Sequence, residues 1–308
     1  MTKRKGRRHN IFYGVVVPVS AVVLSIVLLL VSADKFFGIN ESVLRKLFGI
    51  SDFCHSADGY PLTVHFIDVG QGDSIFIDCG GKYILIDTGE FSSEKTVCRY
   101  LKKYGVKKID LFIATHTDSD HTGDIISIAD SFEIENVMVS SFDMDNEEKT
   151  YGQKMFYDTL REHEINIIRA DIGEYVFGDA VLRVLSPIKD YGDSNENSVV
   201  VRLLYRETSF LFMGDAGKRA ETDILAADEY VHSDVLKTGH HGSKTSTTQK
   251  FYDEVSPKYA VISAGRYNKY LPDRDVLERI DAKLLRTDKN GDIIIASDGK
   301  DISYFCQK

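Results

Sequence analysis

The chain has 308 residues, of which 43% are hydrophobic, and its formal net charge is −9. That apolar content is ample for a sizeable core, whereas the acidic balance argues against a tight, non-specific DNA binder, which is normally basic. The four cysteines include no C-x-x-C pair, which excludes a zinc knuckle or a redox motif, and their pairing cannot be read from the sequence.

The amino end differs from the rest of the chain. Residues 1–10 carry five basic side chains and predict a cytoplasmic tail, and the uncharged run at residues 11–33 is long enough to cross a bilayer as one helix. This charge asymmetry predicts a single-pass protein of the cell membrane with everything after the span outside the cell. A signal peptide cleaved near Ala33, giving a secreted protein, stays an alternative.

Residues 34–60 are expected to be a spacer, with a short helix at residues 43–48 that lies at the membrane surface or against the following domain. No Pro, Gly or Ser tract interrupts the remainder, so residues 61–308 are expected to form one hydrolase domain. Five of the 38 basic and none of the 47 acidic side chains lie in the first 33 residues, so the exported part has a net charge of −14.

The segment THTDSDHTG at residues 115–123 is the most informative in the chain. It follows a strand-like run at residues 109–114 and precedes an apolar run at residues 125–129 that predicts a helix. Two imidazoles and two carboxylates in six residues would repel one another or stay unsatisfied unless a cation lay between them, and two divalent metals fit this donor set. The candidate ligands are His116, Asp118, Asp120 and His121.

Two later strand-like runs end on the same kinds of side chain. One, FLFMGD, ends on Asp215, and the other, VLKTGHHG, ends on His240 and His241. In a sandwich of two sheets, ligands at strand ends meet along one edge. We assign Asp215 and His240 to the metal set and give catalytic roles to Asp120, Asp215 and His241, while the choice between the two adjacent imidazoles as ligand stays open.

The order of these motifs resembles the metallo-β-lactamase superfamily. Within that superfamily, four segments of this chain are similar to the soluble domain of the ComEC competence proteins. They are VHFIDVGQGDS at residues 64–74, ILIDTG at 84–89, NSVV at 197–200 and PKYAVIS at 257–263. The resemblance runs from about residue 62 to residue 294. It implies an α/β fold of the α+β kind, a four-layer αββα sandwich preceded here by one transmembrane helix, with two similar halves at roughly residues 62–187 and 197–305.

The resemblance also implies how the metals are held. In the family pattern His116 and the residue two positions on hold one metal, Asp120 and His121 with a late histidine hold the other, and Asp215 bridges. This chain has Asp118 where many members have histidine, although the ComEC branch shares that aspartate.

A second departure concerns the histidine in the middle of the chain that commonly completes the first site. It is missing, and Asn195 or Asn197 lies where it would come. Oxygen ligands in place of imidazoles move the preference from zinc toward manganese. We therefore expect two divalent metal ions, with both Zn²⁺ and Mn²⁺ kept open.

A hydroxide bound to two metals suits in-line attack at a phosphodiester. Ser243, Lys244 and Thr245 in the histidine loop are expected to donate to the phosphate, and Asn197 is also assigned to substrate binding. The resemblance to ComEC implies DNA as substrate. We therefore expect a membrane-anchored extracytoplasmic metal-dependent hydrolase, a phosphodiesterase or nuclease related to ComEC-type DNA processing, with single-stranded DNA as a candidate substrate.

Two features keep other functions open. Where relatives carry Gly-His-Pro near the end, this chain has Tyr270, Leu271 and Pro272, so the proton for the leaving oxygen would come from water, Tyr267 or Tyr270. The acidic body also fits a cell-surface phosphodiesterase acting on teichoic-acid phosphocholine or small phosphoesters. A non-catalytic DNA-binding relative is the remaining alternative, although it gives no reason to keep six metal ligands.

Overall fold

The computed structural model describes residues 53–91, 94–145, 149–227 and 230–308. They form one compact unit, Phe53–Lys308. The expected tail, membrane span and short helix of the spacer all lie outside the described residues. In the part of the chain that is described, no helix is long and apolar enough to cross a membrane.

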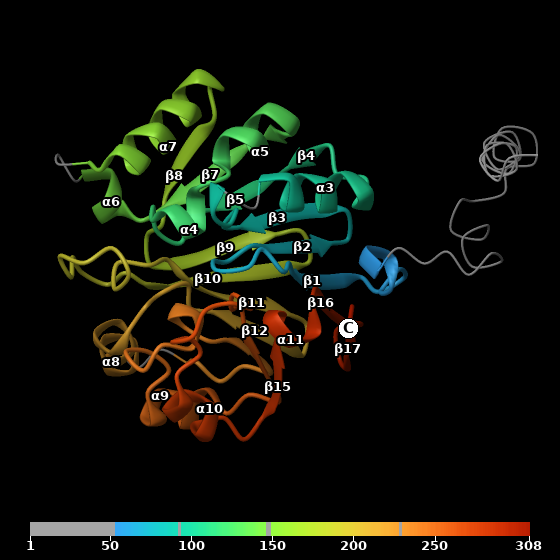
Figure 1. Ribbon diagram of the computed structural model, residues 1–308, viewed down its shortest axis with the longest axis vertical. Helices are drawn as coiled ribbons and strands as arrows, with labels where there is room; N and C mark the ends of the chain where they lie inside the picture. The colour runs from blue at the N-terminus through green and yellow to red at the C-terminus, as the bar shows by residue number, and fades with distance from the viewer. Residues whose placement is uncertain (1–52, 92–93, 146–148, 228–229) are drawn as a thin grey trace, which may run out of the picture. The chain divides into compact units, whose positions relative to one another are not determined.

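Two β-sheets form the centre of this unit (Figure 1). The first has eight strands, in the order β17 (Ile302–Cys306), β16 (Ile293–Ser297), β1 (Leu62–Phe66), β2 (Ile75–Cys79), β3 (Lys82–Ile86), β5 (Leu111–Ile113), β7 (Asn136–Val139) and β8 (Asn166–Arg169). The second has seven, in the order β15 (Lys283–Arg286), β14 (Tyr259–Ile262), β13 (Val235–Lys237), β12 (Thr208–Phe212), β11 (Val200–Tyr205), β10 (Ala180–Ser186) and β9 (Gly173–Phe177). A small pair, β4 (Lys108–Ile109) and β6 (Glu133–Ile134), completes the strands.

Helices cover the outer face of each sheet (Figure 1). The first sheet carries α3 (Glu94–Tyr104), α5 (Ile125–Ser131) and α7 (Tyr151–Glu162), and the second carries α8 (Lys218–Ala226) and α9 (Gln249–Val255). Shorter helices are η1 (Phe53–His55), α4 (Ser119–Thr122), α6 (Ser141–Asp145), η3 (His240–Gly242), α10 (Arg274–Arg279) and α11 (Thr287–Asn290). The four-layer αββα sandwich expected from the sequence is therefore confirmed.

The alternation of side chains along the strands builds the layers. In β12, Phe210 and Phe212 point into the core between the sheets, while Leu211 packs against the outer helices. In β2, Ile77 faces the same central core and Phe76 faces α3 and its neighbours. Where both faces of a sheet are covered, as at β5, β14 and β16, the strands are apolar at nearly every position rather than at every second one.

The last strands of each half cross to the other sheet. β9 and β10 follow the strands of the first sheet but pair within the second, and β16 and β17 return from the second half to pair beside β1. Leu62 of β1 lies opposite Ser297 of β16. The two halves expected from the sequence thus each contribute strands to both sheets.

The amino boundary of the domain differs from the expectation that the spacer extends to residue 60. Cys54 is buried in the helix-covered core, and Ala57 packs against Ile294 and Ala296. The Tyr60 hydroxyl donates a hydrogen bond to Ser303 Oγ at 3.0 Å. Residues 53–60 therefore belong to the domain, because their apolar side chains close the end of the first sheet.

None of the four cysteines, all of which lie in the described part of the chain, forms a disulfide. Cys54, Cys79 and Cys98 are buried and Cys306 is half-buried. Their thiols are small side chains of the cores, as Cys79 shows by its place between the sheets.

Candidate metal centre

The carboxyl ends of strands from both sheets meet at one edge of the sandwich. In the first sheet β1, β3 and β5 run in one direction, because β3 pairs parallel with β5 and β2 is antiparallel to both β1 and β3. In the second sheet β12, β13 and β14 are parallel. The loops that follow five of these strands, β1, β3, β5, β12 and β13, carry the acidic and imidazole side chains of the site.

The loop after β5 delivers the first cluster. It turns into α4, for which Asp118 is the N-cap residue, so that Asp120 and His121 lie on one short helical turn. His116 and His121 are buried, whereas the side chains of Asp118 and Asp120 are 44% and 32% exposed. The cluster thus has a closed side formed by imidazoles and an open side formed by carboxylates.

Thr117 fixes this loop between the two ligand positions that flank it. Its hydroxyl donates to Asp143 Oδ2 at 3.0 Å and accepts from Gln153 Nε2 at 2.9 Å. Burial raises the pKa of Asp143 to about 6, although the hydrogen bond from Thr117 favours its charged form. The buried network joins the loop to α6 and α7.

Asp215 lies at the centre of the cluster. Its Oδ1 is 3.3 Å from His121 Nε2 and 3.6 Å from His241 Nε2. The preceding glycine is required for this approach, because a Cβ on Gly214 would lie 2.8 Å from Thr115 Cβ and its φ is 52°. The Gly-Asp pair therefore brings a carboxylate of the second sheet onto the histidines of the first.

Five buried atoms of this cluster have no hydrogen-bond partner among the described residues. They are Nε2 of His116, His121 and His241, and Oδ1 of Asp73 and Asp215. Leaving such an atom buried and unpaired costs about 1–3 kcal/mol, which a cation in contact with the lone pairs would offset. The unsatisfied atoms converge in the way that a metal site requires.

The candidate ligand atoms form four overlapping sets, and the atoms of each set lie within 4.8 Å of one another. Two sets come from residues predicted above, namely His116, His121 and Asp215, and Asp120, His121 and His241; the other two both include Asp73. A mixture of imidazole nitrogens and carboxylate oxygens suits Zn²⁺ and also Mn²⁺. The residues present thus fit divalent metal ions.

The charges of the site support this reading. Burial alone would raise the pKa of Asp215, but the imidazoles of His241 and His121 hold it well below its usual range. Burial, together with the neighbouring His121, lowers the pKa of His116. At neutral pH Asp215 is therefore ionised and His116 keeps a free lone pair, which are the forms that bind cations.

Asp87, which was missing from the predicted site, orients His121. The carboxylate accepts from His121 Nδ1 at 2.7 Å and from the Thr115 backbone and hydroxyl at 2.9 and 2.7 Å. A carboxylate that accepts from Nδ1 fixes the proton there and leaves Nε2 as the lone pair. The sequence signal is its place directly after the apolar strand β3.

A second carboxylate missing from the predicted site is Asp73, on the loop after β1. Its Oδ1 lies 3.7 Å from His241 Nδ1, and its Oδ2 accepts from Lys237 Nζ at 2.7 Å. His241 Nδ1 also donates to Ser263 O at 3.2 Å, so Nε2 of this ring faces the cluster as a lone pair. Asp87 therefore orients His121, whereas Asp73 Oδ1 has no hydrogen-bond partner among the described residues and belongs, with Asp215 and His241, to a further candidate ligand set.

The loop before β11 contacts the site through serines rather than asparagine. Both amide atoms of Asn197 are used within the loop: Oδ1 accepts from the Tyr191 backbone and Nδ2 donates to Asp190. Ser198 Oγ accepts from the Asp215 backbone at 3.1 Å and lies 3.4 Å from His116 Nδ1. The structure thus gives Asn197 a structural role, and Ser198 lies where a substrate or ligand contact was expected.

The two adjacent histidines take different places. Both have a left-handed backbone, with φ of 46° for His240 and 51° for His241, a conformation that non-glycine residues adopt only under constraint. His241 is buried in the cluster, whereas His240 is 28% exposed and its Nε2 lies 3.6 Å from Asp215 Oδ2. The contacts place His241 among the ligands and His240 beside Asp215, on the open side.

The residues predicted to hold phosphate follow on the rim of the site. Ser243 Oγ lies 2.9 Å from Thr245 Oγ1, which in turn lies 3.4 Å from His240 Nδ1. Lys244 and Thr245 are exposed. All three residues are therefore next to His240 and open to solvent.

A family model described as Metallo-beta-lactamase superfamily matches residues 67–266. Among curated proteins, the chain is 32% identical over 265 residues to "ComE operon protein 3" of Bacillus subtilis and 31% identical over 231 residues to "Competence protein ComA" of Neisseria gonorrhoeae. These matches cover 78% and 73% of this chain but only 33% and 30% of the relatives. The chain thus spans about a third of the length of the relatives it matches, and the resemblance to the ComEC competence proteins is confirmed.

Solved structures agree on the fold. The "metallo-beta-lactamase fold protein YhfI" of Bacillus subtilis matches 79% of this chain and 100% of its own, with a TM-score of 0.51 and 9% sequence identity. At that identity the likeness concerns the fold alone.

Proposed function

Because the chain belongs to the metallo-β-lactamase superfamily, and because its buried imidazole and carboxylate lone pairs converge without partners, we propose that the protein is a metal-dependent phosphodiesterase with nuclease activity. The convergence of the lone pairs on Asp215 is the observation that carries this proposal. Hydrolysis by a two-metal site explains why the fold keeps so many unsatisfied ligands at one edge.

Two ions would share Asp215. His116 and Asp118 would hold one ion, and Asp120, His121 and His241 the other. Asp118 Oδ2 is 3.7 Å from His116 Nε2 and accepts from Ser194 Oγ at 3.2 Å, so this carboxylate is already turned toward the first position. When bound, such ions polarise a phosphoryl oxygen and lower the pKa of water, which is the chemistry that phosphodiester hydrolysis requires.

The residues around the ligands would orient the imidazoles and bind the phosphate. The Asp87 carboxylate and the Ser263 carbonyl would keep the protons of His121 and His241 on Nδ1, so that Nε2 stays available. Ser243, Lys244 and Thr245 on the rim would donate to the non-bridging oxygens of a phosphate. The proton for the leaving oxygen would come from solvent, because Leu271 occupies the family's histidine position and the nearby tyrosines are exposed.

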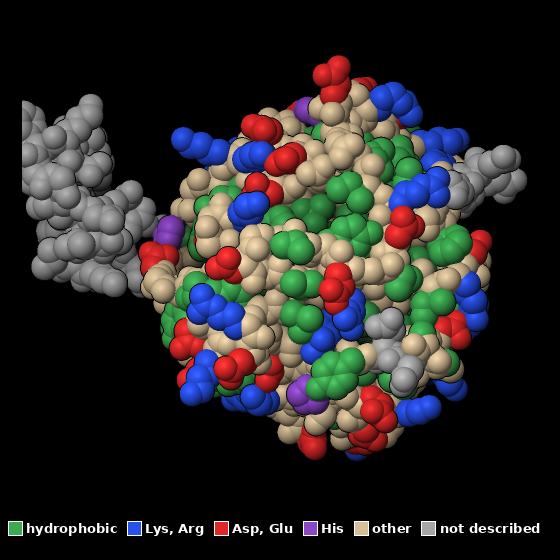
Figure 2. Space-filling model, turned by 180° about the vertical axis from the view of Figure 1, so that it is seen from behind, with side chains coloured by type: hydrophobic (Ala, Val, Ile, Leu, Met, Phe, Trp, Pro, Cys, Tyr) green, Lys and Arg blue, Asp and Glu red, His purple; other side chains and the backbone are tan. Residues whose placement is uncertain are grey.

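The similarity to two competence proteins favours a nucleic acid as the substrate. The acidic balance of the domain favours the second candidate, a phosphodiesterase for small phosphoesters or phosphocholine groups. On the face shown in Figure 2, basic and acidic side chains are interspersed rather than separated into a basic strip. The substrate comparison must therefore include both classes.

We also propose that the uncharged run at residues 11–33 anchors the domain outside the cell membrane. The basic residues before the run would stay in the cytoplasm and the hydrolase domain would face outward.

The test uses the full chain in detergent, loaded in turn with Mn²⁺ and Zn²⁺. Single-stranded DNA, duplex DNA and a small phosphodiester are incubated in parallel, and the Asp215→Asn variant is the control. Cleavage of DNA by the wild type but not by the variant supports the nuclease proposal. Cleavage of the small diester alone supports the second candidate, and no cleavage by a chain shown to hold two ions contradicts both.

A further inference from the structure

Two tyrosines stand out on the surface beside the metal centre. Tyr267 and Tyr270 are 90% and 86% exposed, on the loop between β14 and α10. A large aromatic ring gains little from full exposure, and such side chains often mark a binding surface when they occur together. Both rings are exposed to solvent, while hydrogen bonds to the Asn268 side chain fix the backbone between them.

Hydrogen bonds join both ends of the loop that carries these tyrosines to residues beside the metal centre. At one end the Gly265 backbone donates to Gln71 Oε1 at 3.4 Å, and Asn268 Nδ2 donates to the same oxygen at 2.9 Å. At the other end the backbone of Asp273 donates to Gly242 O at 2.9 Å. Gln71 lies two residues before Asp73 and Gly242 directly follows His241, so residues 265–273 border the ligand cluster.

The same border carries unpaired positive charge. Arg266 and Lys269 on the loop, and Lys244 on the neighbouring rim, are exposed, and none of them forms an ion pair in the described part of the chain. This is notable in an acidic domain. It gives the loop the combination of aromatic rings and free cations that binds single strands.

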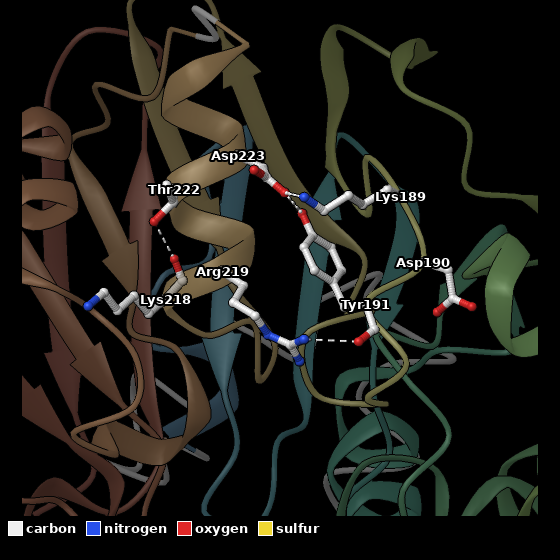
Figure 3. A pocket seen from close by; sticks show the side chains of 7 residues that line it. All are labelled: Lys189, Asp190, Tyr191, Lys218, Arg219, Thr222 and Asp223. Atoms are coloured by element: carbon white, nitrogen blue, oxygen red, sulfur yellow. Dashed lines mark hydrogen bonds and ion pairs between the residues drawn. The ribbon is translucent and has the colours of Figure 1, made fainter.

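A pocket of about 380 Å³ between residues 189–191 and α8 holds three cations, of which only Lys218 forms no ion pair in the described part of the chain (Figure 3). There Lys189 Nζ lies 2.6 Å from Asp223 Oδ2, and Arg219 donates to the Tyr191 carbonyl at 3.0 Å. Since those two cations already have partners, the pocket offers less to a phosphate chain than the tyrosine loop does.

We infer that residues 265–272 form a base-stacking platform, on which Tyr267 and Tyr270 hold nucleobases of a single-stranded nucleic acid while its backbone passes Arg266 and Lys269 toward the metal centre. This inference rests on the proposed function and adds the element that contacts the bases. Stacking contributes about 1–3 kcal/mol per base and requires unpaired bases, which is why a single strand fits and a duplex does not.

The test measures binding without cleavage, using the full chain with metal chelated. Two fluorescent oligodeoxynucleotides of equal length are compared, one with bases and one abasic, so that the phosphate charge is the same. The wild type should bind the first about tenfold more tightly than the second, which is the effect expected from one or two stacked bases. Tyr267→Leu/Tyr270→Leu should remove that preference while the abasic strand binds as before.

The matched control is Tyr230→Leu. Tyr230 is also exposed, at 62%, but precedes the amino end of β13, the opposite end of that strand from the histidines. The Tyr230→Leu variant should keep the preference for the base-containing oligonucleotide. A double variant that keeps the preference, a control that loses it equally, or a loop that binds anionic lipid vesicles in place of the oligonucleotide would overturn the inference.

The outcome is independent of catalysis. If the wild type shows the preference but cleaves no phosphodiester under any metal, the platform stands and the proposed function fails. If the wild type cleaves DNA but the tyrosine variant retains the full preference, the proposed function stands and the platform fails.

Discussion

Lys237 Nζ lies 2.7 Å from Asp73 Oδ2, and both side chains are buried where the two sheets meet beside the metal centre. Burial alone would raise the pKa of Asp73, but the Lys237 ammonium holds it below its usual value. The ion pair joins β13 of the second sheet to the loop after β1 of the first. It therefore fixes the carboxylate that faces His241.

Removing one partner of this pair leaves a buried charge uncompensated. Lys237→Met should lower the free energy of unfolding by roughly 3–5 kcal/mol, measured by urea denaturation of the metal-free protein. The double variant Lys237→Met/Asp73→Leu should recover much of that loss, because both charges are then gone. A single variant as stable as the wild type would show that the pair adds nothing to the fold.

Asp87 gives a prediction about metal affinity. Asp87→Ala should weaken metal binding by roughly 10–100-fold, because His121 loses the partner that keeps its proton on Nδ1. Competition with a chromophoric chelator measures this. Asp87→Asn, whose amide oxygen can still accept from His121, should lose less; equal losses in the two variants would contradict an orienting role.

Asp215→Asn should keep the fold and reduce phosphodiester turnover by at least about 100-fold, in line with the loss of a key group in a polar active site. The amide is a poor bridge between two cations, so bound metal should fall toward one ion per chain. Turnover and metal content are measured on the same sample, with circular dichroism as the check on folding. A fully active variant would remove Asp215 from the mechanism.

His65 predicts how stability depends on pH. Its ring is buried, with Nε2 2.7 Å from Thr63 Oγ1 and Nδ1 2.7 Å from Tyr100 OH, and burial lowers the pKa of His65 to about 3. In the unfolded chain His65 binds a proton near pH 6.5, whereas in the folded protein it stays neutral down to about pH 3. The stability of the fold is therefore unaffected by protonation of His65 above pH 6.5 and decreases as the pH falls from 6.5 toward 3.

The slope should be about 1.4 kcal/mol per pH unit for this one group. Urea unfolding of the metal-free protein at pH 7, 6 and 5 would measure it, with His65→Gln as the reference that cannot titrate. The difference in stability between wild type and variant should shrink as the pH falls. A difference that stays constant between pH 7 and pH 5 would mean that His65 has the same pKa in the folded and the unfolded chain.

The amino-terminal segment predicts the topology of the chain. Protease added to intact cells should digest the hydrolase domain and leave a short membrane-bound fragment, because five basic residues precede residues 11–33. Complete protection would reverse the orientation. Recovery of the domain from the medium instead would indicate a cleaved signal peptide.

Much of the fold and of the ligand set could be predicted because the information is local. Four candidate ligands of the loop after β5 lie within six residues of sequence. Asp215 and the two adjacent histidines each follow an apolar, strand-like run. Strands such as β5, β14 and β16 are continuous apolar runs, because both faces of the sheet are buried there.

What the sequence could not provide depends on contacts between distant segments. Asp73 and Lys237 become partners only when the two sheets pack, so neither has a pattern of its own. The roles of His240 and His241 are decided by a left-handed turn at two non-glycine residues, which propensity does not predict. The inclusion of residues 53–60 in the domain, where the sequence predicted a spacer up to residue 60, likewise depends on distant contacts such as that of Ala57 with Ala296.

The return of β16 and β17 to the side of β1 has a consequence for biosynthesis. Leu62 and Ser297 are opposite one another in the sheet but are made far apart in time. A ribosome must release nearly the whole domain before the first sheet gains these strands, and the histidines from the second half arrive after those of the first. A nascent chain therefore carries no assembled metal centre, and the centre forms only once translation of the domain is almost complete.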